Sequence, residues 1–547
     1  MAQHSPIDEP VQLIHMKNLI ITFLLSLVLP LQAGIRERVH LISDKEVYLS
    51  GEKILVTLRT TNEKKQKLIF SKIAYAELAD SAVSHAQAMT LVSDGMGTMA
   101  LSIPEDLPTG YYRLIAYTRY MLNESADIRN EKLIAVINPK TLNIKQLTGS
   151  SEQHLNSDLQ SSLILRCNQK TYQQRQKGEI SIDNLPDDLV SYTLSIASDL
   201  PNIPIPLAGN TLSEPLQPVS TRFLAEYEGS VVRARITGMQ DDSRKLLLSV
   251  PGRNPEVFTG KKLDTGEYEF ITGALTGVAE LATTLDTRDD ERYTIDFVSP
   301  YAPVQLRRLP VLKIDSTLTA DILRRHVALQ VRSAFGLAYE QETPARMVQS
   351  TSTPEWTYIL KEYTRFNTIE EVILEYVTNV RFRKIGNIRT LAINREGSDG
   401  YTMGNTLVLL DNVPVFSHEL LLQYDADRIE KIDIYRKQHV FGGQLYDGIV
   451  AFKSYEGNFR GFQLDRSTLI SSYKGPQAGV TLTKPDRAGA PKNLPDVRTT
   501  LYWQSGNKPD TRIPFETSDV SGHFKVVLVG LRRDGQEVKS TTRFYVR

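Results

Sequence analysis

Residues 51–59 read Gly-Glu-Lys-Ile-Leu-Val-Thr-Leu-Arg, with an apolar side chain at every second position from Ile54 to Leu58. Successive side chains of a β-strand point to opposite faces, so Ile54, Val56 and Leu58 would lie on one face. Residues 111–118 repeat this alternation. The pattern therefore predicts strands that bury one face.

The same alternation recurs in later parts of the chain. Turn signals such as Ser93-Asp94-Gly95 separate the runs at roughly 8–12-residue spacing. Several short strands at that spacing are typical of antiparallel β-sandwiches. The later runs are Ser162–Ser198, Gly229–Phe297 and Thr499–Val546. We therefore expect a mainly β protein made of several immunoglobulin-like sandwiches.

Two segments break this pattern and predict helices. Thr317–Ala334 has few turn residues and carries apolar residues that could line part of a helical face. Asn367–Val380 is the stronger prediction, because Thr368 can cap the helix and Glu371 stands three residues later. We expect these helices to belong to a connecting region.

Residues 391–455 indicate a small mixed αβ module. Leu407–Leu410 is a continuous apolar run, as expected of a strand covered on both faces. Asp411–Pro414 reads as a turn, in which asparagine tolerates positive φ. Asp425 can cap a short helix, and Ile449–Phe452 predicts the closing strand.

The composition indicates a large protein of several domains. The 547 residues include 64 basic and 64 acidic side chains, so the formal charge is zero. Such a chain lacks the electrostatic attraction of a nucleic-acid binder. The single cysteine, Cys167, rules out an internal disulfide framework and a four-cysteine zinc site. No motif for a metal, nucleotide or other cofactor is present, and we expect none to be bound.

The start of the chain predicts export. Leu19–Leu29 is strongly apolar but too short for a transmembrane helix, which needs ~20 residues. Lys17 precedes this run, and small residues ending at Ala33 follow it, as in a secretory signal. We therefore expect a signal peptide over residues 1–33, with translation starting at Met16. The mature protein would be exported.

Two stretches resemble the second macroglobulin domain of the alpha-2-macroglobulin superfamily. Asp44–Ile54 reads DKEVYLSGEKI and matches the family's YxxGE strand, while Pro104–Met121 reads PEDLPTGYYRLIAYTRYM and matches its lpxGxYxlxAYT strand. The resemblance implies a macroglobulin-like sandwich in a bacterial envelope protein, which would be periplasmic or associated with the outer membrane. Cys167 lies outside any GCGEQ motif, so we expect no thioester and no covalent trapping of proteinases.

A third stretch, Leu407–Phe452, resembles the plug domain of TonB-dependent outer-membrane receptors. It contains LVLLDNVPV, DADRIEKIDIYR and GGQLYDGIVAF, with Asn412 where the family usually has glycine. Too few residues follow Phe452 for a barrel of ~22 strands of ~9–11 residues each, so transport by this chain alone is not expected. The resemblance implies a detached plug that docks to a barrel, or beside one, contributed by another chain.

The plug resemblance also implies where a partner would bind. We expect the loop 411–417 to be exposed at the ends of the apolar strands. The candidate partner-binding residues are Asp411, Asn412, Val413, Pro414, Gly442, Gly443, Asp447 and Gly448.

Two further clusters suggest chemistry but have simpler explanations. Ser471–Lys474 forms an SxxK sequence, which in penicillin-recognising enzymes supplies nucleophile and base, but its companion motifs are missing and it follows a strand-like segment. The acidic cluster comprises Asp286, Asp289, Asp290 and Glu291. It lacks the central glycine of a calcium loop, so a solvated hairpin tip is favoured.

Basic and aromatic clusters are similarly ambiguous. The basic cluster comprises Arg381, Arg383, Lys384 and Arg389. It could bind lipopolysaccharide phosphates or an acidic protein, although charged edge strands are common. The aromatic cluster comprises Tyr111, Tyr112, Tyr117 and Tyr120. Tyrosines can stack on sugar rings, but strands favour tyrosine in any case.

These observations together predict a modular, non-enzymatic scaffold of the bacterial envelope. Its recognition element would be the plug-like module, and its partner an outer-membrane protein. The alternatives are a glycan-binding accessory of a polysaccharide-uptake system and a hydrolase with a dispersed site. The expected domains are a macroglobulin-like sandwich at 34–140, sandwiches at 155–225 and 226–300, a helical connection at 301–385, the plug-like module at 386–465 and C-terminal sandwich strands at 490–547.

Overall fold

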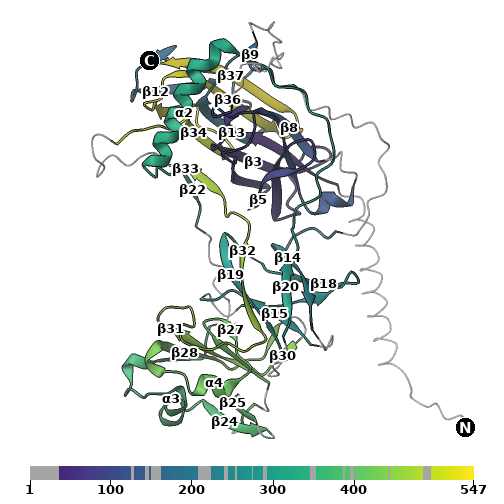
Figure 1. Cartoon of the computed structure of the whole chain (residues 1–547), viewed down its shortest axis with the longest axis vertical. Coiled ribbons are helices and arrows are strands. Elements are labelled where there is room, and N and C mark those ends of the chain that lie inside the picture. Colours follow the sequence, from purple (N-terminus) through teal and green to yellow (C-terminus); the bar gives the residue numbers. More distant parts are fainter. Residues whose placement is uncertain are drawn as a thin grey trace, which may run out of the picture. The chain divides into compact units, whose positions relative to one another are not determined.

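The fold was obtained as a computed structural model of the chain (Figure 1). It describes residues 36–124, 129–141, 147–148, 162–206, 223–239, 244–252, 256–273, 275–286, 292–344, 353–385, 388–394, 400–402, 405–441, 444–483 and 494–547. The expected signal peptide, most of the acidic cluster and the Gly442-Gly443 pair lie outside these residues.

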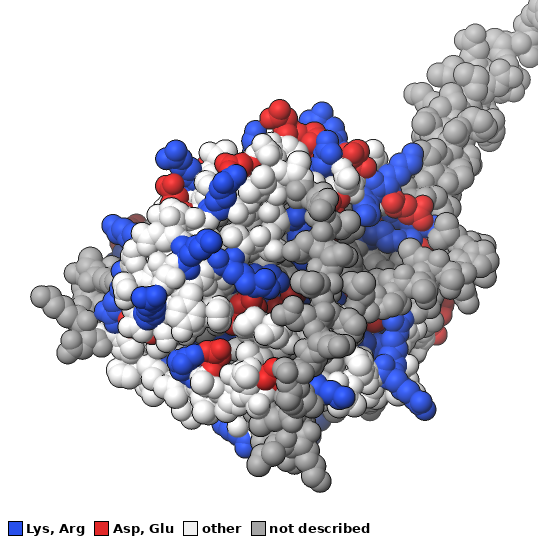
Figure 2. All heavy atoms as spheres, turned by 90° about the horizontal axis from the view of Figure 1, so that it is seen from above, with Lys and Arg blue, Asp and Glu red and all other residues white. Residues whose placement is uncertain are grey.

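The chain forms two compact units, and strands dominate both, which confirms the prediction of a mainly β protein. Unit 1 comprises Met1–Tyr227, Ala302–Thr343 and Gln477–Arg547, and unit 2 comprises Glu228–Tyr301 and Pro344–Pro476. Basic and acidic side chains are interspersed over the face of the chain in Figure 2, as its equal numbers of the two charges lead one to expect. Within the described residues, no helix has the length and apolar character needed to cross a membrane.

The first sandwich of unit 1 lies where the macroglobulin-like domain was expected. One sheet has the order β1-β3-β6 and the other the order β2-β8-β7-β4-β5. Their bounds are β1 Glu37–Ser43, β2 Val47–Leu49, β3 Lys53–Asn62, β4 Ile73–Ala79, β5 Ser84–Leu91, β6 Met96–Ser102, β7 Gly110–Tyr117 and β8 Asn130–Ile137.

Strand β3 is buried on both faces rather than one. Ile54, Val56 and Leu58 are buried as predicted, but so is Leu55, which packs with Trp503 of the neighbouring sandwich. Thr57 also hydrogen-bonds across to Ser505 at 2.6 Å. The two sandwiches of unit 1 therefore share an interface that the alternation of β3 does not predict.

The second sandwich of unit 1 combines two segments that were expected to be separate. Its sheets have the orders β10-β12-β35 and β11-β37-β36-β13-β34, so strands from 155–225 pair with strands from 490–547. Leu194 and Ile196 of β13 join Val526 and Leu528 of β36 in one core. The bounds are β10 Ile164–Cys167, β11 Thr171–Tyr172, β12 Lys177–Asp183, β13 Leu189–Ser198, β34 Thr500–Gly506, β35 Arg512–Glu516, β36 Gly522–Arg532 and β37 Glu537–Val546.

The expected helical connection is divided between the units. Helix α2 (Thr319–Ala334) belongs to unit 1, where Ile322 packs against Val47 and Leu49. Unit 1 also contains the short pairs β9 (Leu147–Thr148) with β21 (Ile314–Asp315) and β22 (Glu340–Glu342) with β33 (Val480–Leu482).

Unit 2 contains a third sandwich, which a distant strand completes. Its sheets have the orders β17-β18-β14-β20 and β16-β15-β19-β32, and β32 lies far beyond the expected domain end at residue 300. The bounds are β14 Val231–Thr237, β15 Leu246–Ser249, β16 Val257–Thr259, β17 Lys261–Lys262, β18 Glu267–Ile271, β19 Val278–Leu285, β20 Thr294–Phe297 and β32 Thr468–Lys474.

The rest of unit 2 is the mixed αβ module. Its sheet has the order β23-β28-β31-β26-β27, with β26 parallel to β31. Helix α3 begins at the predicted capping box, in which Glu371 donates its backbone N–H to Thr368 and its carboxylate accepts from the Thr368 N–H. The bounds are β23 Trp356–Ile359, α3 Ile369–Glu375, β24 Val380–Ile385, β25 Ile388–Ile393, β26 Thr406–Leu410, β27 Val413–Pro414, α4 His418–Leu422, β28 Ile429–Tyr435, β29 His439–Phe441, β30 Gln444–Tyr446 and β31 Gly448–Ser454.

Candidate functional site

The predicted partner-binding turn lies in the interior of unit 2. Asp411 and Asn412 have φ of +47° and +69° and connect β26 to β27, so the predicted turn is present. Both side chains are buried, however, as are Val413 and Pro414. The Asn412 side chain bonds to the backbone at the end of β15 and the start of β16: it donates to the Val250 carbonyl at 2.9 Å and accepts from the Glu256 N–H at 3.0 Å. The expectation of an exposed loop is therefore wrong for this turn, because the third sandwich covers it.

Asp411 connects the turn to the chain that follows β31 and to the third sandwich. Its carboxylate accepts hydrogen bonds from the Ser454 N–H at 2.7 Å, the Ser454 hydroxyl at 2.5 Å and the Phe459 N–H at 2.6 Å. Its own carbonyl accepts from the Gly252 N–H. This geometry explains the aspartate as a structural residue that fixes the chain after β31.

The two described residues of the second predicted stretch also have structural contacts. Gly448 has φ of +153°, and a Cβ there would lie 2.7 Å from the carbonyl oxygen of Tyr435, so only glycine fits. Asp447 is half-buried and accepts a hydrogen bond from the Gln438 amide at 3.2 Å. Partner binding by the predicted set stays an untested prediction, and its buried members would not reach a partner.

The other sequence candidates have structural roles. Ser471 and Lys474 are three positions apart on strand β32, so they project from opposite faces and cannot act on one substrate. Tyr111, Tyr112 and Tyr117 are buried, which removes them as a sugar platform. Within the described residues, no group of three His, Cys, Asp or Glu side chains could hold a metal ion.

The basic cluster forms the hairpin β24–β25, and much of its charge is engaged. Arg389 forms an ion pair with Glu370, and Arg381 stacks on the Tyr401 ring at 4.7 Å. Arg383 donates to the Thr402 carbonyl at 3.3 Å. Cys167 is half-buried, and burial raises the pKa of its thiol, which disfavours the reactive thiolate.

The mixed αβ module of unit 2 has a cavity of about 260 Å³, called here the module pocket. Its buried apolar floor comprises Leu360, Val372, Ala426 and Ile429. Its rim comprises Lys361, Thr364, Arg365, Phe366, Tyr376, Asp427 and Tyr455. The sequence did not predict this pocket, because the residues that line it come from segments up to 95 positions apart.

Aromatic rings surround the module pocket. Tyr363 and Tyr376 stack with centroids 4.3 Å apart, and Phe366 lies 6.1 Å from Tyr376. Burial raises the pKa of Tyr376, so its phenol stays protonated as a donor. Tyr455, which also lines the pocket, is 56% exposed. An apolar floor with a Tyr–Arg rim can bind either a protein side chain or a sugar ring.

Charged side chains also line the module pocket. The side chains of Lys361, Arg365 and Asp427 are exposed, and within the described part of unit 2 none of them is in an ion pair. Charged groups held beside an apolar floor give a ligand orientation as well as affinity.

Comparisons with known proteins give only distant similarities. No protein-family model and no curated protein matches the chain. Among solved structures, it is similar to Salmonella alpha-2-macroglobulin reacted with methylamine, at 9% identity over 93% of this chain and 39% of that one, with a TM-score of 0.22. Native Escherichia coli alpha-2-macroglobulin gives 8% identity over 94% and 40%, with a TM-score of 0.22.

A third similarity is to the Escherichia coli adhesin FdeC, at 12% identity over 52% of this chain and 66% of that one, with a TM-score of 0.15. The chain spans about two fifths of the length of the alpha-2-macroglobulins it matches. At these scores the likeness assigns neither a family nor a function.

Proposed function

We propose that the chain is a non-enzymatic interaction scaffold of the bacterial envelope. The β-sandwiches of its two units would act as rigid supports, and the plug-like module would bind an outer-membrane protein through the module pocket. The observation that carries this proposal is the exposed Tyr–Arg rim around an apolar floor. Tyrosine and arginine are the residues that most often dominate protein interfaces, because they combine large contact area with directional hydrogen bonds.

Substituting the rim tests docking without disturbing the fold. Tyr455 and Arg365 are exposed, and we expect Arg365→Glu with Tyr455→Ala to lower partner recovery at least about ten-fold in a pull-down from crosslinked envelopes. Lys437→Glu makes the same charge change at an exposed residue outside the pocket and should leave recovery unchanged. Equal recovery by both proteins would contradict docking through this pocket. Point variants are preferable to deleting 400–455, which would remove four of the five strands of the module sheet.

Glycan binding is a second candidate, favoured by the same rings. A sugar ring presents C–H groups that stack on aromatic faces and hydroxyls that bond to carboxylates such as that of Asp427. If this function holds, migration in affinity gels should be retarded by a soluble glycan, and Tyr455→Ala should abolish the retardation. An unchanged mobility in every polysaccharide gel tried would leave protein docking as the proposal.

A further inference from the structure

An irregular segment of unit 1, residues 302–313, lies against one face of the five-stranded sheet of the first sandwich. It contains neither helix nor strand and is called here the strap. At its start, the Ala302 N–H donates to the Tyr117 hydroxyl of β7 at 2.8 Å. Near its end, Leu312 packs in a core cluster with residues of β2, β7 and β8. The strap is therefore attached to the same sheet at both ends.

Polar contacts fix the middle of the strap. Arg113 of β7 donates to the Gln305 carbonyl at 2.6 Å, and the Arg307 guanidinium lies 3.2 Å from the carboxylate of Glu131 on β8. The Arg307 N–H also donates to the Ser81 carbonyl, at 2.9 Å, in the hairpin that joins β4 to β5. The side of the strap that faces the sheet is thus polar and paired, and its backbone is held in place.

The opposite side of the strap exposes aliphatic side chains. Leu306 precedes Arg307 and is 83% exposed, and Val311 precedes the buried Leu312 and is 81% exposed. Neighbouring side chains of an extended backbone point to opposite sides, so both aliphatic groups point away from the sheet. Among the described residues, no large apolar side chain is more exposed. Val83, at the tip of the hairpin that binds the strap, is 56% exposed. Exposed apolar groups on a fixed backbone indicate a contact surface.

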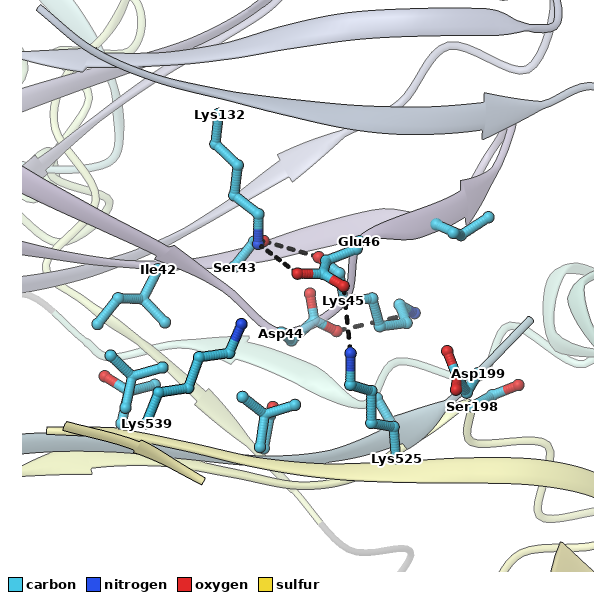
Figure 3. Close-up of a pocket in the computed structure, with 16 residues that line it drawn as sticks. Ile42, Ser43, Asp44, Lys45, Glu46, Lys132, Ser198, Asp199, Lys525 and Lys539 are labelled. Atoms are coloured by element: carbon cyan, nitrogen blue, oxygen red, sulfur yellow. Dashed lines mark hydrogen bonds and ion pairs between the residues drawn. The ribbon is translucent and has the colours of Figure 1, made fainter. Parts of the chain in front are cut away.

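Positive charge accompanies these aliphatic groups. The strap contains three basic residues and no acidic one. Of the three, Arg308 and Lys313 are exposed, and within the described part of the chain neither is in an ion pair. Other basic residues of unit 1 are placed differently: Lys132 and Lys525 point toward the Glu46 carboxylate, at 3.6 and 3.2 Å (Figure 3). The two strap cations are therefore available to an external anion.

The acids next to the strap have partners of their own. The Glu131 carboxylate lies between two guanidinium groups, 3.4 Å from Arg113 and 3.2 Å from Arg307. The Asp80 carboxylate accepts hydrogen bonds from two N–H groups of its own hairpin, at 2.7 and 2.8 Å. Asp315, just beyond the strap, caps the short helical turn that follows it. None of these carboxylates is paired with an exposed strap cation.

We propose that the strap and the hairpin tip dock unit 1 onto an anionic phospholipid surface. Leu306, Val311 and Val83 would enter the boundary between headgroups and acyl chains, while Arg308 and Lys313 would contact lipid phosphates. A lipid surface fits this composition better than a protein does, because leucine and valine are under-represented among the residues that dominate protein interfaces. The site does not rest on the module pocket, which belongs to unit 2.

A fluorescent label on the strap reports docking locally, so that the apolar run Leu19–Leu29 of the full chain does not obscure it. Leu306→Cys, in a Cys167→Ser background, carries a polarity-sensitive fluorophore and is titrated with vesicles of equal parts phosphatidylglycerol and phosphatidylcholine. We expect a saturable blue shift of the emission, and vesicles of phosphatidylcholine alone should require at least about ten-fold more lipid. The same label at Val278→Cys, an exposed position of unit 2, should not shift.

Variants of the labelled chain separate the two contributions. Arg308→Gln with Lys313→Gln should raise the lipid concentration at half-maximal shift at least about ten-fold, and Val311→Ser at least about five-fold. Lys508→Gln, at an exposed lysine of the second sandwich, should leave it unchanged. Equal shifts of the strap and unit 2 labels, or a titration indifferent to phosphatidylglycerol or to the charge variant, would overturn the proposal. A blue shift caused by envelope proteins in detergent, but not by vesicles or detergent alone, would overturn the choice of lipid in favour of a protein.

Discussion

Replacing Arg325 by methionine is expected to lower the free energy of unfolding of unit 1 by about 3–5 kcal/mol, the range for removing one partner of a buried ion pair. Arg325 on α2 is 1% exposed, and its Nε and Nη2 donate to both carboxylate oxygens of Glu52 at 2.7 and 2.6 Å. Nη2 also donates to the Val47 carbonyl at 2.9 Å. The substitution leaves the Glu52 carboxylate buried with only Lys45, at 3.5 Å, as a counter-charge.

The two tryptophans make this measurement specific to one unit. Trp503 lies in unit 1 and Trp356 in unit 2, so urea unfolding of unit 1 can be followed by Trp503 fluorescence in a Trp356→Phe background. Arg324→Met, at the exposed neighbour, should change the free energy by less than about 0.5 kcal/mol. Adding Glu52→Leu to Arg325→Met should restore part of the loss, since no unpaired charge then remains. If Arg325→Met were as stable as Arg324→Met, the stabilising role assigned to the Arg325–Glu52 pair would be contradicted.

The Arg325–Glu52 ion pair should also make the stability of unit 1 depend on pH in the acidic range. Burial alone would raise the pKa of Glu52, but Arg325 and then Lys45 lower it to about 2, against 4.5 for the ordinary group. A carboxyl whose pKa is lower in the folded state stabilises the fold above the unfolded value and loses that contribution as the pH falls. The stabilisation by Glu52 should therefore be full above about pH 4.5 and disappear toward pH 2, a decline that the double variant should lack.

Asp411→Ala is expected to lower the free energy of unfolding of unit 2 by about 3–5 kcal/mol, because it leaves the buried N–H and hydroxyl of Ser454 and the partly buried N–H of Phe459 without an acceptor. Alanine also tolerates the positive φ of this position less well than aspartate does. Asp411→Asn keeps one acceptor oxygen, so it should lower the free energy of unfolding less than Asp411→Ala does.

Trp356 fluorescence in a Trp503→Phe background reports this loss within unit 2. Asp427→Ala removes an exposed carboxylate of the same module and should leave the unfolding midpoint in place. If Asp411→Ala matched that control and instead abolished partner recovery, the turn would be a contact surface, as the sequence had indicated.

Local sequence patterns predicted individual strands and helices, but they did not predict which strands pair with one another. The alternation of Ile54, Val56 and Leu58 predicted a strand, and Thr368 with Glu371 predicted the start of α3, because both signals depend on neighbours within a few residues. The pairing of β13 with β34 and β36 joins residues some three hundred positions apart, and no local pattern encodes it.

The candidate sites show the same division. Asp411 and Asn412 correctly predicted a turn, but the expectation that this turn would be exposed was wrong. Its burial depends on the segment around β15 and β16, which precedes it by about 150 residues. Lys132 of β8 and Lys525 of β36, which are almost four hundred positions apart, lie 3.6 and 3.2 Å from the Glu46 carboxylate, and no local pattern singles out either lysine. Only the folded chain brings them together around Glu46.

The division of unit 1 into three chain segments has a consequence for the order of folding. Strand β13 is central in its sheet, yet both its neighbours, β34 and β36, come from the last fifty residues. As the chain emerges in order from its N-terminus, all strands of unit 2 are available before β13 acquires either neighbour. Unit 2 can therefore fold early, whereas in unit 1 both edges of β13 stay unpaired until the segment with β34 and β36 has been synthesised.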